Sequence, residues 1–244
     1  MNTKFYLFFI FFSFQMAFAQ TTPAEHEISD KLRKIAKNPD LDLEPKKKEA
    51  LLLQLKAQSE KLDYKLGILI SGDYLMRLYL GEGKNNDVIK LGDELKKVAK
   101  NEKDTDGYIS SIYNRNALAL GYLGFADASL KDLRAVLKHA PDIKDKDKRF
   151  YVLSQFYHEI GLQYDLKRNE NKKLRDSMVY TYNKSIELAK QISDNSKSVT
   201  KDVKYDLIGF NYMRLGVFYI GFDDIKGNLE LAEKYLLLGL DIYE

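Results

Sequence analysis

Apolar and polar residues alternate with the period of an α-helix along almost the whole chain. From about residue 27 onward, apolar residues recur at three- and four-residue steps, which places them on one face of a helix. No segment keeps the two-residue alternation that is typical of a half-buried strand. The sequence therefore predicts an all-α protein with helices at 27–37, 46–61, 64–81, 86–100, 106–123, 126–139, 147–167, 172–193, 200–221 and 227–243.

Short breaks, not a long linker, separate the predicted helices. Pro39, Pro45 and Pro141 fall between helices, where a missing backbone N–H does no harm. Clusters of polar residues and glycine separate other neighbours, at 81–86, 144–148 and 193–196. Because no Ser/Pro-rich segment divides the chain, we expect one helical domain over residues 20–244.

Four successive helix pairs share one pattern of small and large residues. The first helix of each pair carries a small residue between larger ones, at Ser71, Ala117, Gly161 and Gly216. The second helix carries a matching face, at Val88-Gly92-Leu95, Ser129-Leu133-Val136, Met178-Tyr182-Ser185 and Ala232-Leu236-Gly239. A small residue lets the two helices of a pair approach closely. The pattern predicts a degenerate capping pair at 27–61 and four repeats, at about 64–100, 106–141, 147–193 and 200–243.

This pattern resembles the tetratricopeptide repeat (TPR). The best single match covers residues 110–141, where residues fall at the family's spacing without a gap: Tyr113, Ala117, Leu120, Gly124, Ser129, Leu133, Val136 and Pro141. The resemblance implies a right-handed α-solenoid of antiparallel helix pairs, a TPR-like superhelix. The other repeats carry extra residues between their two helices, and their helices are longer than those of the family. A helical bundle without repeats is the alternative.

The resemblance also implies a surface that binds another protein or a peptide. In that family, the first helices of the pairs line a concave groove in which extended or helical peptides dock. Carried over to this chain, the partner-binding residues are Asn114, Tyr122, His158, Leu162, Asp165, Phe210, Met213 and Val217. Methionine and aromatic side chains at the C-terminal end of such a groove adapt to a partner. The alternative is that a neighbouring helix covers these residues.

The last predicted helix, 227–243, is apolar over a wide arc. Projection at about 100° per residue places Ala232, Leu236 and Gly239 together, where they face the first helix of their own pair. A second stripe flanks them and has no expected neighbour in this chain: Leu231, Tyr235, Leu238 and Ile242. We expect this stripe to be an association surface, most simply a homodimer contact. The alternative is that helix 200–221 or the loop 222–228 covers it.

Composition and motifs argue against catalysis. The chain has no cysteine and three histidines, which excludes thiolate zinc sites, iron–sulfur clusters and cysteine nucleophiles. His158-Glu159 begins a zinc-protease motif, but Leu162 occupies the place of the second histidine. Residues 81–84 lack the third glycine and the preceding strand of a phosphate loop. We therefore expect no enzyme, no catalytic residues, no metal and no cofactor.

Charge does not indicate nucleic-acid binding. Lys and Arg number 39 against 36 Asp and Glu, a net charge of +3. Basic residues at 144–149 alternate with acidic ones, which is typical of a solvated surface and not of a phosphate-binding stripe. We therefore expect a protein or peptide partner and no nucleic acid.

Residues 1–19 have the features of a bacterial signal peptide. Lys4 gives a positive start, the run from Phe5 to Phe14 is apolar, and Ala17-Phe18-Ala19 forms a cleavage site. The sequence thus predicts export to the periplasm or secretion, with no transmembrane span after cleavage. The favoured interpretation is an exported, non-catalytic binding scaffold. The alternative is the sensory ectodomain of a membrane-bound regulator whose other parts lie outside this chain.

Cleavage of the signal peptide gives the first prediction. The mature protein should begin at Gln20, because the small residues of Ala17-Phe18-Ala19 fit the cleavage site. Amino-terminal sequencing of the protein from envelope or secreted fractions measures this directly. Most of the protein retaining Met1 would contradict cleavage.

Overall fold

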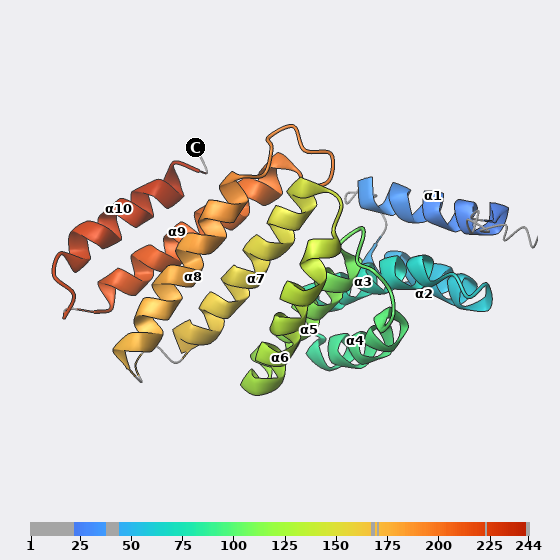
Figure 1. Cartoon of the computed structure of the whole chain (residues 1–244), viewed down its shortest axis with the longest axis horizontal. Helices are drawn as coiled ribbons and strands as arrows, with labels where there is room; N and C mark the ends of the chain where they lie inside the picture. The colour runs from blue at the N-terminus through green and yellow to red at the C-terminus, as the bar shows by residue number, and fades with distance from the viewer. Residues whose placement is uncertain (1–21, 38–43, 167–168, 170, 223, 243–244) are drawn as a thin grey trace, which may run out of the picture.

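The computed structural model of this chain is all-helical. It describes residues 22–37, 44–166, 169, 171–222 and 224–242, so the predicted signal peptide lies outside the described residues. Within this part of the chain there is no strand. The helices are α1 (Pro23–Lys37), α2 (Pro45–Lys61), α3 (Lys65–Gly81), α4 (Asn85–Ala99), α5 (Tyr108–Tyr122), α6 (Ala126–His139), a 3-10 turn (Ala140–Asp142), α7 (Lys146–Leu166), α8 (Lys172–Lys190), α9 (Lys201–Ile220) and α10 (Asn228–Leu240) (Figure 1).

Local signals in the sequence fix where several helices begin. The Asn171 side chain caps α8 by accepting the N–H of Leu174 at 3.0 Å. α1 begins before the predicted residue 27, because Thr22 and Glu25 form a reciprocal cap. The Thr22 hydroxyl accepts the N–H of Glu25 at 3.3 Å, and the Glu25 carboxylate accepts the N–H of Thr22 at 2.5 Å.

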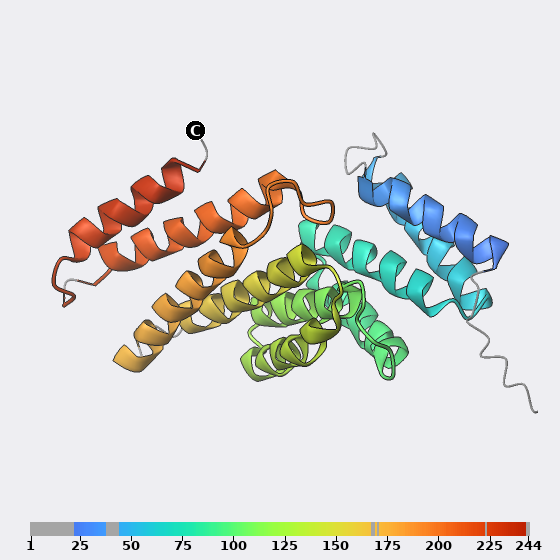
Figure 2. The ribbon, with the colours of Figure 1, turned by 45° about the horizontal axis from the view of Figure 1, so that its top comes forward.

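Helices that are neighbours in the chain pack as pairs, and the pairs follow one another. The first helices α3, α5, α7 and α9 pack against the second helices α4, α6, α8 and α10, respectively. Each of α4, α6 and α8 also packs against the first helix of the next pair, and α3 contacts α5 as α5 contacts α7. The same contacts link α1 and α2 to α3. Figures 1 and 2 show the resulting arc, with α1 and α10 at opposite ends.

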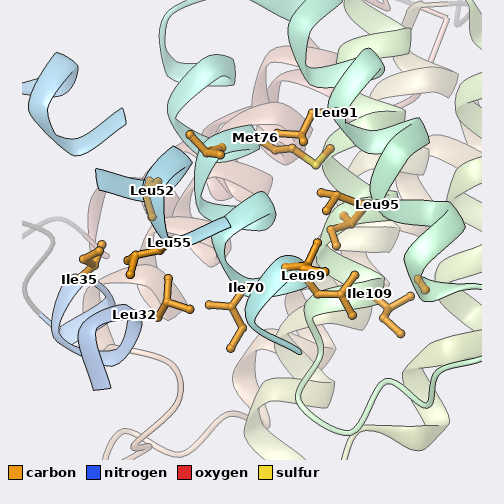
Figure 3. Packing of buried hydrophobic residues seen from close by; sticks show 14 of the residues in the cluster. Leu32, Ile35, Leu52, Leu55, Leu69, Ile70, Met76, Leu91, Leu95 and Ile109 are labelled. Atoms are coloured by element: carbon orange, nitrogen blue, oxygen red, sulfur yellow. The ribbon is translucent and has the colours of Figure 1, made fainter. Parts of the chain in front are cut away.

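The hydrophobic core runs along this arc and has no single centre. Its N-terminal part joins α1 through α5; Figure 3 shows Leu32 of α1, Leu55 of α2 and Leu95 of α4 among the packed side chains. A middle cluster joins α5, α6 and α7, and a C-terminal cluster joins α7 through α10. The core is continuous only because successive pairs cover one another.

The predicted small residues mark close contacts in three of the four pairs. A Cβ added at Gly161 would lie 2.5 Å from the Tyr182 ring. A Cβ added at Gly216 would lie 2.6 Å from Leu236. The Ser129 hydroxyl donates to the carbonyl of Ala117 at 2.8 Å. In α3 a close approach is seen at Gly72, where an added Cβ would lie 2.5 Å from Leu95, and the predicted Ser71 beside it is fully buried.

The prediction for the Leu231–Ile242 stripe is wrong in its premise. Tyr235, Leu238 and Ile242 pack against the C-terminal core cluster, and Leu231 is half-buried. The Tyr235 ring stacks on Tyr219 of α9, with centroids 5.6 Å apart and planes 2° apart. The physical reason is the size of the α9 tyrosines, which reach past the helix contact and cover this flank of α10.

Packing at Gly216 gives a second prediction. Gly216→Leu should lower the free energy of unfolding by about 1–3 kcal/mol. A side chain here meets Leu236 and, at 3.2 Å, the backbone carbonyl of Ala232, which cannot move aside easily. Denaturant unfolding followed by circular dichroism measures the loss. The matched control is Gly81→Leu, since a Cβ there meets nothing within 4 Å; equal losses for both variants would contradict the packing role.

Candidate functional site

An apolar surface on the last helix pair is the main candidate site. Among the residues that the structure describes, seven large apolar side chains on α9 and α10 are more than one-third exposed. We call them the C-terminal apolar face: Phe210, Met213, Val217 and Ile220 of α9, and Leu229, Leu237 and Leu240 of α10. Their exposed fractions run from 36% at Met213 to 67% at Leu229. Exposed apolar side chains that gather in this way mark an interaction surface more often than isolated ones do.

Four of these side chains, from both helices, line a shallow cleft: Ile220, Leu229, Leu237 and Leu240. Its volume is about 360 Å³, and its lining residues are Ile220, Leu229, Ala232, Glu233, Leu236, Leu237 and Leu240. Glu233 is the only charged residue among them. Met213 continues the surface along α9, because a Cβ added at Gly239 of α10 would lie 3.1 Å from the Met213 side chain. The site can therefore take up apolar groups and offers little to a charged ligand.

Three of the predicted partner-binding residues, Phe210, Met213 and Val217, lie on this face. The predicted partner-binding residues do not include three exposed leucines of α10, Leu229, Leu237 and Leu240. The sequence carries a signal for them, because they follow helical spacing along one flank of Ala232 and Gly239. The predicted stripe Leu231–Ile242 lies along the other flank. Both flanks are apolar, so the helical projection could not decide which one α9 covers.

Two predicted groove residues are buried instead. His158 and Asn114 are 9% and 6% exposed, because successive first helices pack over them. His158 Nδ1 lies 2.9 Å from Asn211 Oδ1, so the ring nitrogen donates to the amide oxygen. Burial lowers the pKa of His158 and favours the neutral ring. Asn211 in turn donates to Ser185 Oγ at 3.0 Å, so this chain of hydrogen bonds joins α7, α8 and α9.

The remaining predicted residues are dispersed. Leu162 is half-buried against the C-terminal core cluster. Asp165 forms an ion pair with Arg214 of α9, with 3.7 Å between Oδ2 and Nη1. Tyr122, the last residue of α5, is 66% exposed. The predicted groove is thus a set of contacts between first helices, and its accessible part is the α9 segment together with Tyr122.

A buried polar cluster lies where α3, α5 and α7 meet. Arg115 donates from Nε to Asp73 Oδ1 at 2.8 Å, and Asp73 is 4% exposed. The Lys148 ammonium lies 5.9 Å and 5.6 Å from the ring centroids of Tyr108 and Tyr151. Burial lowers the pKa of Lys148 and raises that of Tyr151. The enclosed Arg115–Asp73 ion pair joins α5 to α3, and loss of either partner would leave a costly buried charge.

Glu159 is a buried carboxyl group without a counter-charge. It aligns with Arg115 and Arg214 in the repeats, and both arginines pair with an aspartate of the preceding first helix. The α5 residues that align with those aspartates are Ala119 and Gly121. Glu159 Oε2 accordingly has no hydrogen-bond partner. Burial raises the pKa of Glu159 to about 8.

Metal-binding side chains do not gather in the described part of the chain. No group of three or more His, Asp or Glu residues there could hold a metal ion. Among the helices that the structure describes, none is long and apolar enough to cross a membrane. The arrangement is suited to binding apolar groups at the C-terminal apolar face.

The buried carboxyl group gives a third prediction. Because the pKa of Glu159 is about 8 in the folded protein, against an ordinary value near 4.5, the unfolded chain releases this proton first. The stability that the neutral carboxyl contributes is complete below about pH 4.5 and is lost as pH rises toward 8. Glu159→Gln should therefore be more stable than wild type at pH 8, by about 2–4 kcal/mol, and similar at pH 4.5.

Thermal melts at both pH values measure this difference. Glu230→Gln, at an exposed glutamate of α10 outside the cleft, is the control and should follow wild type. A Glu159→Gln variant whose stability relative to wild type does not change with pH would show that the carboxyl is hydrated.

Neither family models nor curated proteins nor solved structures give a significant match to this chain.

Proposed function

We propose that this protein is a non-catalytic scaffold of the bacterial cell envelope that binds another protein or a peptide. In this proposal the helix pairs form a right-handed, TPR-like solenoid, and residues 1–19 direct export. The contacts of each second helix with both its own first helix and the next one support a repeat architecture. The N-terminal sequence supports export.

The observation that carries the proposal is the C-terminal apolar face. Its seven side chains expose on the order of 700 Å² of surface, taking about 200 Å² for each fully exposed large side chain. The largest apolar patch on a typical monomer measures about 300–600 Å². A surface of this size with a single acidic residue in its cleft is expected to be covered by another protein.

Non-catalytic binding agrees with the placement of the titratable groups. Glu159 and His158 have shifted pKa values because they are buried between helices, and both lie outside the lining of the apolar cleft. A shifted pKa indicates a catalytic group when the group faces a cleft. Here the shifts follow from helix packing.

Site-specific crosslinking in the producing cells tests the proposed function. A photo-reactive amino acid at Leu237, which is 52% exposed, should crosslink to a protein in envelope fractions. The same amino acid at Leu53 of α2, which is 46% exposed, is the matched control and should give none. Mass spectrometry identifies the product. Equal crosslinking at both positions, or none at Leu237, would contradict binding through this face.

A further inference from the structure

The C-terminal apolar face occupies a defined place in the repeat. When the repeats are aligned at Gly161 and Gly216, His158 aligns with Met213 and Asp165 with Ile220. α7 uses His158 and Asp165 to contact α9, the first helix of the next pair. The corresponding α9 positions are therefore those at which a further first helix would pack.

The second helices of the pairs also indicate that this face lies where a further pair would pack. When Met178 is aligned with Ala232, Arg175 of α8 aligns with Leu229 and Tyr182 with Leu236. Arg175 contacts the segment that follows α9, donating to both carboxylate oxygens of Asp224 at 2.9 Å. On α10, the corresponding leucines line the exposed cleft. Met213, Ile220 and Leu229 of the face thus lie at positions that an additional helix pair would contact.

The C-terminal apolar face is less polar than the surface buried between the third and fourth helix pairs. Between the third and fourth pairs, His158, Ser185 and Lys190 each lie within hydrogen-bond distance of an α9 side chain, at 2.7–3.0 Å. At the C-terminal end, Met213 and Gly239 stand in the places of His158 and Ser185. A helix like α9 would leave its buried polar groups unpaired here, which is costly. The occupant must present an apolar surface instead.

The opposite end of the molecule cannot supply that surface. α1 turns Ile28, Leu32 and Ile35 inward, each at most 5% exposed. Its outer side is charged, with Glu27, Asp30, Lys31, Arg33 and Lys34 exposed. A head-to-tail contact between copies would bury these charges against leucines, at a large desolvation cost. Among the described residues, the C-terminal apolar face matches a second copy of itself better than it matches the charged outer side of α1.

We infer that the C-terminal apolar face binds the same face of a second copy about a two-fold axis. An isologous contact brings identical patches together, so apolar side chains meet apolar side chains. The exposed area, on the order of 700 Å² per chain, is close to the roughly 800 Å² that each partner buries in a standard-size interface. This inference rests on the proposed function, since it names the partner of the same surface; the helices toward α1 remain free in such a dimer.

Sedimentation equilibrium of the full chain tests the contact. Wild type should have twice the mass of one chain. The double variant Val217→Glu, Leu237→Glu should have the mass of one chain with an unchanged far-ultraviolet circular dichroism spectrum, because both residues are about half exposed, at 53% and 52%. The matched control, Leu53→Glu with Leu137→Glu on α2 and α6, adds the same charges to side chains that are 46% and 44% exposed and should remain a dimer.

The absence of cysteine provides an independent measurement. A single Leu240→Cys substitution, 54% exposed in the separate chain, should give a chain-to-chain product with a bismaleimide, whereas Leu53→Cys should not. A monomeric wild type at its highest soluble concentration, or no product from Leu240→Cys, overturns the inference. If the wild type is monomeric and Leu237 crosslinks to a different protein, the proposed function stands and only the second copy is refuted as the partner. A dimer without any other envelope partner would support the inference and limit the scaffold to self-association.

Discussion

Each helix pair in this protein has two apolar surfaces, and it can bury only one of them within itself. Gly161 and Gly216 let the two helices of a pair touch, and the remaining surface is covered by the pair that follows. The core is therefore a line of clusters along the arc and not a single centre. At one end of the described arc, α1 turns a charged side outward. At the other end, the C-terminal apolar face leaves large apolar side chains exposed.

Buried polar contacts give the stack its order. Apolar surfaces alone would allow pairs to pack in several registers, but a buried charge or amide must meet its own partner. Arg115 meets Asp73 between α5 and α3, and Asn211 joins His158 to Ser185 between α9, α7 and α8. Glu159 is the exception, since the α5 residues that align with Asp73 and Asp165 are Ala119 and Gly121. Burial favours the protonated form of this carboxyl group, so the packing at this junction is sensitive to pH.

Most of the fold could be predicted from local sequence signals. The predicted helix at 126–139 is found at those residues, and the other boundaries differ by a few residues. Helical period and turn residues act over one or two turns, so they can be seen in the sequence. Long-range contacts cannot be seen in this way. The contact of Gly72 with Leu95 depends on how α4 approaches α3, and the burial of His158 depends on a residue in α9.

The sequence by itself determined an all-helical chain, the pairing of its helices and an apolar C-terminal end. It also showed that both flanks of the last helix are apolar. Only the tertiary structure decided which flank is free. The tyrosines of α9 cover Tyr235 and its neighbours, and Leu229, Leu237 and Leu240 stay exposed. The physical reason is that hydrophobic periodicity identifies only which residues are apolar and lie on one side of a helix. The crossing of two helices and the length of their side chains decide which of these residues are buried.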